Sequence, residues 1–119
     1  MTYPILRLSD YVIASIKSAP GDQDLLWFRD EPTKLTGETR ARGVIVDVTG
    51  VDVMDSFATR TLRAIACMTR LCGAETVIVG IQPDVALSMV QLGLTFANVP
   101  TALDLEEGLG YLNQRLEQP

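Results

Sequence analysis

The sequence predicts an α/β domain with a mostly parallel sheet and an antiparallel hairpin at its start. The hydrophobic period switches repeatedly between about two and about 3.6 residues along the chain. Two β-branched apolar runs, at 43–48 and 76–81, are typical of strands buried on both faces. Helical segments separate these runs, which is the α/β pattern. The chain has 119 residues, the length of one domain, and no linker composition interrupts it.

The hairpin is predicted from two short strands at 5–8 and 11–16, joined by a tight turn at 9–10. A break at 20–22 precedes a helix that we expect to start near Gln23, because an aspartate there is a good N-cap.

Pro32 lies in the middle of this first predicted helix. Leu25, Phe28 and Leu35 recur at helical spacing around it. Because an interior proline removes a hydrogen bond and costs about 3 kcal/mol, we expect a kink at Pro32 or two short helices.

The central strand at 43–48 leads into a loop and then a helix at 56–71. Gly73 stands where a glycine ends such a helix. The second buried strand, at 76–81, is followed by a helix that Pro83 opens and Gly93 ends. A short edge strand within 96–102 and a last helix at 103–116 complete the pattern.

Composition excludes several classes of function. The net charge is −5, so nucleic acid, which repels an acidic surface, is not an expected partner. The apolar runs are too short to span a bilayer, so no membrane association is expected. Residues 1–4 lack the pattern of a signal peptide, so the expected location is cytoplasmic. With no histidine, His-dependent hydrolases and His-ligated zinc are excluded. We therefore expect no enzyme, catalytic residue, metal or cofactor.

The two cysteines, Cys67 and Cys72, are five residues apart in or beside the helix at 56–71. At about 100° per residue their side chains face different directions, so we expect no disulfide. They are interpreted as reduced thiols that pack as small hydrophobic side chains.

The segment 47–57 lies at the carboxyl end of the central strand, where open α/β sheets place their ligand sites. Asp55 or Ser56 is expected to be the N-cap of the following helix, and Asp47 to cap a loop or turn. A Mg²⁺ site made by Asp47, Asp52 and Asp55 would need further carboxylates to converge on it.

The helix at 56–71 is predicted to expose a basic face that begins at Ser56. At about 100° per residue, Ser56 falls within about 60° of four other side chains, namely Arg60, Arg63, Cys67 and Arg70. The opposite side carries the expected core stripe of Ala58, Leu62, Ile65, Ala66 and Thr69. A kinase can reach a hydroxyl so placed, and the helix end favours a phosphate there, although Asp52 and Asp55 oppose it.

Several stretches resemble the STAS domain, the fold of bacterial anti-sigma-factor antagonists. The resemblance is carried by residues 43–47, 51–60 and 77–83. Three shorter segments are similar to the RsbS type, the single-domain scaffold of the stressosome, and these are 55–57, 80–83 and 92–94. The likeness extends from about Tyr3 to Leu116.

The resemblance implies a single STAS domain over 1–119, with a mixed sheet of four to five strands and helices packed mainly on one face. It implies phosphorylation of Ser56 by a serine/threonine kinase of the RsbT type, co-assembly with RsbR-type paralogues, and a phosphatase that resets the serine. Phosphorylation then releases the kinase, and the chain works as a homo- or hetero-oligomer. The unbroken first helix of the family is put in doubt here by Pro32.

Residues around Ser56 are the predicted partner face. Arg60 and Arg63 are expected to pair with an acidic partner surface and, with Asp55, to form the binding residues. Thr59, one turn on and near the edge of the exposed face, is a secondary candidate for phosphorylation. Apolar residues near the edge strand, Leu94 and Phe96, are a further candidate contact between copies.

Other interpretations remain open at this point. A phosphate-receiver domain would use Asp47, but it needs a lysine near the last strand, and Lys17 and Lys34 come too early in the chain. A serine nucleophile at Ser56 would lack a histidine base and an oxyanion hole. Within the STAS class, the alternative is a free anti-sigma-factor antagonist that binds an anti-sigma kinase and is switched off by phosphorylation of Ser56.

Overall fold

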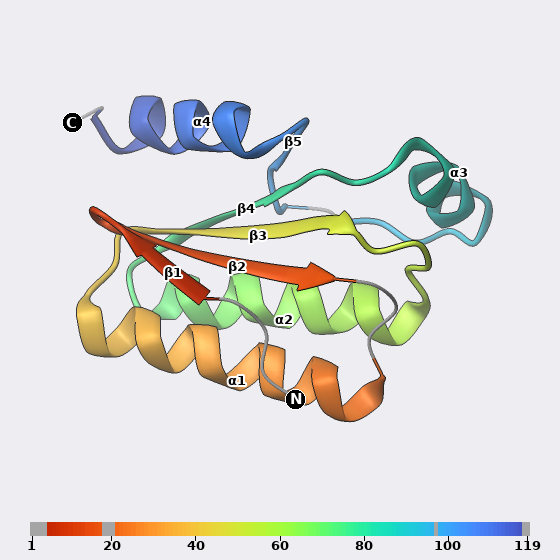
Figure 1. The fold of residues 1–119 in the computed structure, drawn as a ribbon, viewed down its shortest axis with the longest axis horizontal. Coiled ribbons are helices and arrows are strands. Elements are labelled where there is room, and N and C mark those ends of the chain that lie inside the picture. The colour runs from red at the N-terminus through yellow and green to blue at the C-terminus, as the bar shows by residue number, and fades with distance from the viewer. Residues whose placement is uncertain (1–4, 18–20, 97, 118–119) are drawn as a thin grey trace.

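The molecule is built on one mixed sheet. Its strands are β1 (Ile5–Leu8), β2 (Tyr11–Lys17), β3 (Gly43–Gly50), β4 (Glu75–Val79) and β5 (Thr101–Ala102). They lie in the order β1-β2-β3-β4-β5 (Figure 1). β1 is antiparallel to β2, and every later neighbour is parallel. The predicted mixed sheet with an N-terminal hairpin is therefore confirmed.

The computed structural model describes residues 5–17, 21–96 and 98–117. Residues 1–4, where we expect no signal peptide, and Pro20 of the predicted break lie outside that part of the chain. The side chain of Lys17 also lies outside it. Among the described residues, no helix combines the length and the apolar character needed to cross a bilayer.

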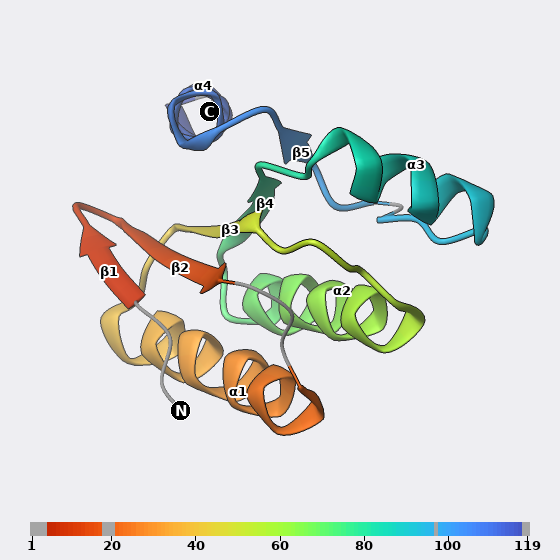
Figure 2. The same ribbon diagram turned by 45° about the vertical axis from the view of Figure 1, so that its right-hand side comes forward.

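Four helices accompany the strands in the described part of the chain. They are α1 (Asp22–Thr39), α2 (Ser56–Leu71), α3 (Pro83–Gln91) and α4 (Leu105–Glu117). α1 and α2 run side by side under one face of the sheet, and α4 lies over the other face (Figures 1 and 2). α3 stands beyond the carboxyl ends of the strands, with its buried residues Val85 and Met89 in the same core as α1 and α2. The helices thus lie mainly on one side, as expected, and α4 is the one helix of the described residues that covers the second face.

The alternation of side chains in β3 explains its unbroken apolar sequence. Val44, Val46 and Val48 belong to the core between the sheet and the α1–α2 pair. Ile45 belongs to the smaller core between the sheet and α4. Since successive side chains of a strand point to opposite faces, a strand covered on both sides is apolar at every position.

The first helix is continuous through Pro32, so the prediction of two short helices is wrong. Pro32 is buried on the same stripe as Leu25, Phe28 and Thr36. The Thr36 hydroxyl donates to the Pro32 carbonyl oxygen at 2.7 Å. Burial of this stripe against the rest of the core offsets the roughly 3 kcal/mol that an interior proline costs. The helix also begins one residue earlier than predicted, after Gly21.

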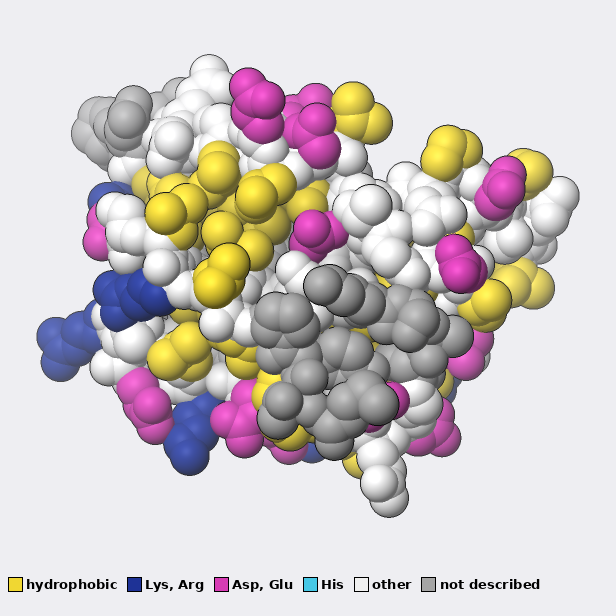
Figure 3. Space-filling view, viewed as in Figure 1, with side chains coloured by type: hydrophobic (Ala, Val, Ile, Leu, Met, Phe, Trp, Pro, Cys, Tyr) yellow, Lys and Arg dark blue, Asp and Glu magenta, His cyan; other side chains and the backbone are white. Residues whose placement is uncertain are grey.

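The second face of the sheet is only partly covered. Figure 3 shows apolar side chains gathered between α4 and the β1–β2 hairpin. On β1, Leu6 is 63% exposed and Leu8 is 49% exposed. At the other edge of the sheet, Phe96 is buried and Leu94 is half-buried against the core. The expectation that Phe96 offers an apolar contact to another copy is therefore wrong, because it already packs inside this chain.

Candidate functional site

The start of α2 is capped by Asp55. Its carboxylate oxygen Oδ1 accepts a hydrogen bond from the Ala58 backbone N–H at 2.8 Å, and its backbone is extended. Asp55 therefore satisfies one of the free N–H groups that every helix leaves at its first turn. Of the two predicted caps, Asp55 is the one that the structure uses.

Ser56 is consequently the first helical residue and has no capping role. Its side chain is exposed, and its hydroxyl makes no hydrogen bond to any described residue. A free hydroxyl at the first position of a helix is accessible to another protein.

The outward face of α2 follows the predicted pattern. Ser56, Arg60, Cys67 and Arg70 are exposed, and Arg63 is half-buried. The predicted core stripe on the opposite side is buried throughout, and consists of Ala58, Leu62, Ile65, Ala66 and Thr69. Arg70 donates to the Asn98 carbonyl oxygen at 3.3 Å, so the last basic residue of this face is tied to the loop before β5.

Thr59 does not lie at the edge of the exposed face, and that prediction is wrong. Its side chain is fully buried, and its hydroxyl donates to the Asp55 carbonyl oxygen at 2.9 Å. The buried residues of α2 include Thr59 and Thr61, so the buried arc of the helix is wider than its apolar stripe alone indicates. Thr59 therefore loses its support as a second phosphorylation candidate.

Both cysteines are free thiols, as predicted, but they are not buried as expected from the sequence. Cys67 and Cys72 are exposed, so they do not pack as small hydrophobic side chains. Cys67 lies on the basic face of α2, and Cys72 follows the end of the helix.

Asp47 lies within β3, so the prediction that it caps a loop or turn is wrong. Its Oδ1 atom accepts hydrogen bonds from the Thr49 backbone N–H at 2.9 Å and from the Thr49 hydroxyl at 2.6 Å. Among the described residues, no group of three or more acidic or sulfur ligands converges as a metal site would require. Asp47, Asp52 and Asp55 accordingly give no support to the alternative of a Mg²⁺ centre.

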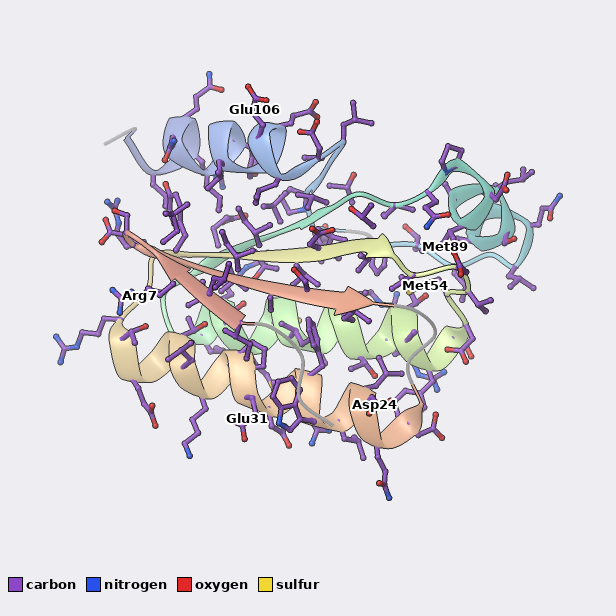
Figure 4. The ribbon with its side chains drawn as sticks, viewed as in Figure 1. Arg7, Asp24, Glu31, Met54, Met89 and Glu106 are labelled. Carbon is purple, nitrogen blue, oxygen red and sulfur yellow. The ribbon has the colours of Figure 1, made fainter. Side chains whose placement is uncertain are left out.

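Gln82 joins the loop before α3 to the loop before α2, a role that the sequence alone did not reveal. Its amide Nε2 donates to the Thr49 carbonyl oxygen at 2.6 Å and approaches Asp52 Oδ1 at 3.5 Å. The segment 80–83, which contains Gln82, supported only the family resemblance, and no role was assigned to Gln82 itself from the sequence. Met54, in the loop before α2, and Met89, on α3, also lie at this end of the sheet and are buried in the same core (Figure 4).

We expect Gln82→Ala to loosen the loop that leads to Ser56. Removal of the amide leaves the Thr49 carbonyl without this partner, so amide hydrogen exchange over 50–55 is expected to accelerate by several-fold. The expected loss in free energy of unfolding is about 1 kcal/mol. Gln91→Ala, at the exposed end of α3, is the matched control and is expected to leave this exchange unchanged. Unchanged exchange in both variants would show that Gln82 does not hold the loop.

Taken together, the sheet, the capped α2 and the exposed Ser56 define a small α/β domain that presents a hydroxyl on a helix surface rather than inside a pocket. The chain belongs to the STAS domain family, whose model matches residues 26–108.

Solved structures of two relatives resemble the whole chain. A substituted form of RsbS from Moorella thermoacetica superimposes with a TM-score of 0.85 and 30% identity, covering 99% of this chain and 100% of that one. A chain in a solved structure of the stressosome, described as a signal integration and transduction hub, gives a TM-score of 0.79 and 31% identity. This match covers 97% of the present chain and 100% of the other.

Among curated proteins, the chain is similar to the RsbT co-antagonist protein RsbRD of Bacillus subtilis, with 36% identity over 66 residues. The match covers 56% of this chain but 24% of RsbRD. The chain therefore spans about a quarter of that relative's length, so the similarity concerns the STAS domain and not the remainder of RsbRD.

Proposed function

We propose that this chain is a non-enzymatic, phosphorylation-controlled scaffold of a bacterial stressosome. In this function it binds a serine/threonine kinase of the RsbT type and co-assembles with RsbR-type paralogues. Phosphorylation of Ser56 releases the kinase, and a phosphatase resets the site. Asp55, Arg60 and Arg63 form the part of the partner face nearest to Ser56.

The observation that carries the proposal is the free hydroxyl of Ser56. The capping role belongs to Asp55, so modification of Ser56 sacrifices no hydrogen bond among the described residues. A phosphate there sits at the positive end of the α2 dipole and is tolerated by the fold.

The modification itself is a transfer of the γ-phosphoryl group of ATP. The Ser56 oxygen forms a bond to phosphorus while the bond to the β-phosphate bridging oxygen breaks, giving ADP, and the hydroxyl proton passes to a base of the kinase. The scaffold contributes only the acceptor. Phosphorylation adds about −1.5 to −2 charges at neutral pH, which is a large change on a face meant for a partner.

A free anti-sigma-factor antagonist would use the same fold and the same serine. The solved relatives with 30% and 31% identity are an RsbS and a stressosome chain, which favours the scaffold. Co-expression with an RsbR-type paralogue distinguishes the two. We expect a large particle that contains both chains on size-exclusion chromatography and electron microscopy. A small dissociable complex with a kinase alone would favour the antagonist.

The proposal is tested by intact-mass spectrometry after incubation with the kinase and ATP. We expect one added phosphate on the wild-type chain and none on Ser56→Ala. Ser88→Ala, which changes an exposed serine of α3, is the matched control and is expected to accept one phosphate. A phosphate retained on Ser56→Ala, or no phosphate on any variant, would overturn the proposal.

A further inference from the structure

Arg60 lies one helical turn after Ser56 on the same exposed face of α2. Residues four apart on a helix are neighbours, with Cβ atoms about 5–6 Å apart. Within the described part of the chain, Arg60 forms no ion pair and no hydrogen bond. Arg70, by contrast, is bonded to the loop before β5. Arg60 is thus a cation held next to the acceptor hydroxyl with its guanidinium uncommitted.

We infer that Arg60 changes partners when Ser56 is phosphorylated: it is free for an acidic partner surface in the unmodified chain, and it pairs with the phosphate of its own helix afterwards. The inference rests on the proposed modification of Ser56. It adds the residue that receives the new charge within this chain.

The charges around Ser56 explain why one arginine matters. Asp52 and Asp55 belong to the loop before α2, and both are exposed. Other acidic groups stand at the neighbouring helix starts, namely Asp84 on α3 and Asp22 and Asp24 on α1. All of them oppose a phosphate dianion. On the face of Ser56, Arg60 is the basic residue within one turn, whereas Arg63 lies about 10 Å along the axis.

The exchange of partners makes the switch stronger than the phosphate alone. An unmodified face offers the guanidinium of Arg60 to an acidic partner. A modified face both presents a phosphate and withdraws that guanidinium, because a charge-assisted pair with a phosphate is bidentate and close. The added phosphate and the loss of the Arg60 guanidinium then both weaken the complex with the acidic partner.

The test uses the full chain with phosphoserine genetically encoded at position 56, so that no kinase is needed. Phosphorus NMR measures the second pKa of the phosphate, which is ordinarily near 6. A neighbouring cation favours the dianion and lowers this pKa. In Arg60→Gln we expect the pKa to be higher by roughly 0.2–0.7, the size expected of an exposed ion pair.

Two further variants make the measurement decisive. Arg60→Lys keeps the charge and is expected to retain most of the lowered pKa. Arg63→Gln removes a cation from the same face two turns away and is expected to titrate like the wild type. If Arg60→Gln titrates like the wild type, or if Arg63→Gln moves the pKa as much, the inference is wrong.

Failure of this inference and failure of the proposed function are separable. If the kinase modifies Ser56 but the titration is independent of Arg60, the scaffold function stands and the role of Arg60 is lost. If the titration depends on Arg60 but the kinase leaves Ser56 unmodified, the proposed function fails and the local ion pair remains.

Discussion

Gly80→Ala is expected to lower the free energy of unfolding by roughly 2–4 kcal/mol, combining backbone strain with a steric collision. Gly80 has φ +83°, in the left-handed region that side chains rarely adopt. A Cβ at this position would collide with the Thr49 side chain and lie 3.2 Å from the Thr49 Cα atom. Since one of these contacts is with the backbone, a side-chain rotation alone does not relieve it.

Gly73 provides a matched control for this prediction. Its φ is +86°, nearly the same, but a Cβ there meets no atom within 4 Å. Gly73→Ala therefore measures the strain alone, about 1–2 kcal/mol. Urea unfolding of both variants gives the difference, and Thr49→Ala in the Gly80→Ala background is expected to recover part of it. Equal losses for the two glycines would show that the approach to Thr49 costs nothing.

The collision would reach the functional site because Gly80 and Gln82 act on the same residue. Gly80 lets the chain after β4 pass against Thr49, and Gln82 then donates to the Thr49 carbonyl oxygen. The loop that follows Thr49 ends at the cap of α2. The position of Ser56 thus depends on a close approach between the ends of two adjacent parallel strands.

Local signals in the sequence predicted most of the fold. The bounds of α2 were predicted correctly because a polar cap, a clear apolar stripe and a terminal glycine, Gly73, all agree there. The acceptor candidate Ser56 followed from the same helix, since periodicity alone places it on the exposed side.

Features that depend on distant packing could not be predicted. Pro32 stays within one helix because its stripe is buried, which outweighs local propensity. Thr59 is buried by tertiary packing, which the periodicity of α2 alone does not predict. The bond from Gln82 to Thr49 spans 33 positions, so only the assembled sheet brings these residues together.

Ser56→Glu is expected to weaken the binding of this chain to the kinase by about tenfold to several-hundred-fold. The interface would have to desolvate an added carboxylate, a penalty of several kcal/mol, and each 1.4 kcal/mol is a tenfold change in Kd. Ser56→Gln has nearly the same shape without the charge, and is expected to bind within a few-fold of the wild type. Isothermal titration calorimetry with the kinase measures all three chains.

The same substitution is expected to act on stability with the opposite sign. A carboxylate in the first turn of α2 interacts favourably with the helix dipole, so Ser56→Glu should unfold at the same temperature as the wild type or slightly above it. Loss of binding without loss of stability separates charge repulsion from misfolding. The defect should also shrink at high salt, because exposed charges are screened. If Ser56→Gln binds as weakly as Ser56→Glu, the interface excludes size rather than charge, and phosphorylation does not act through electrostatics.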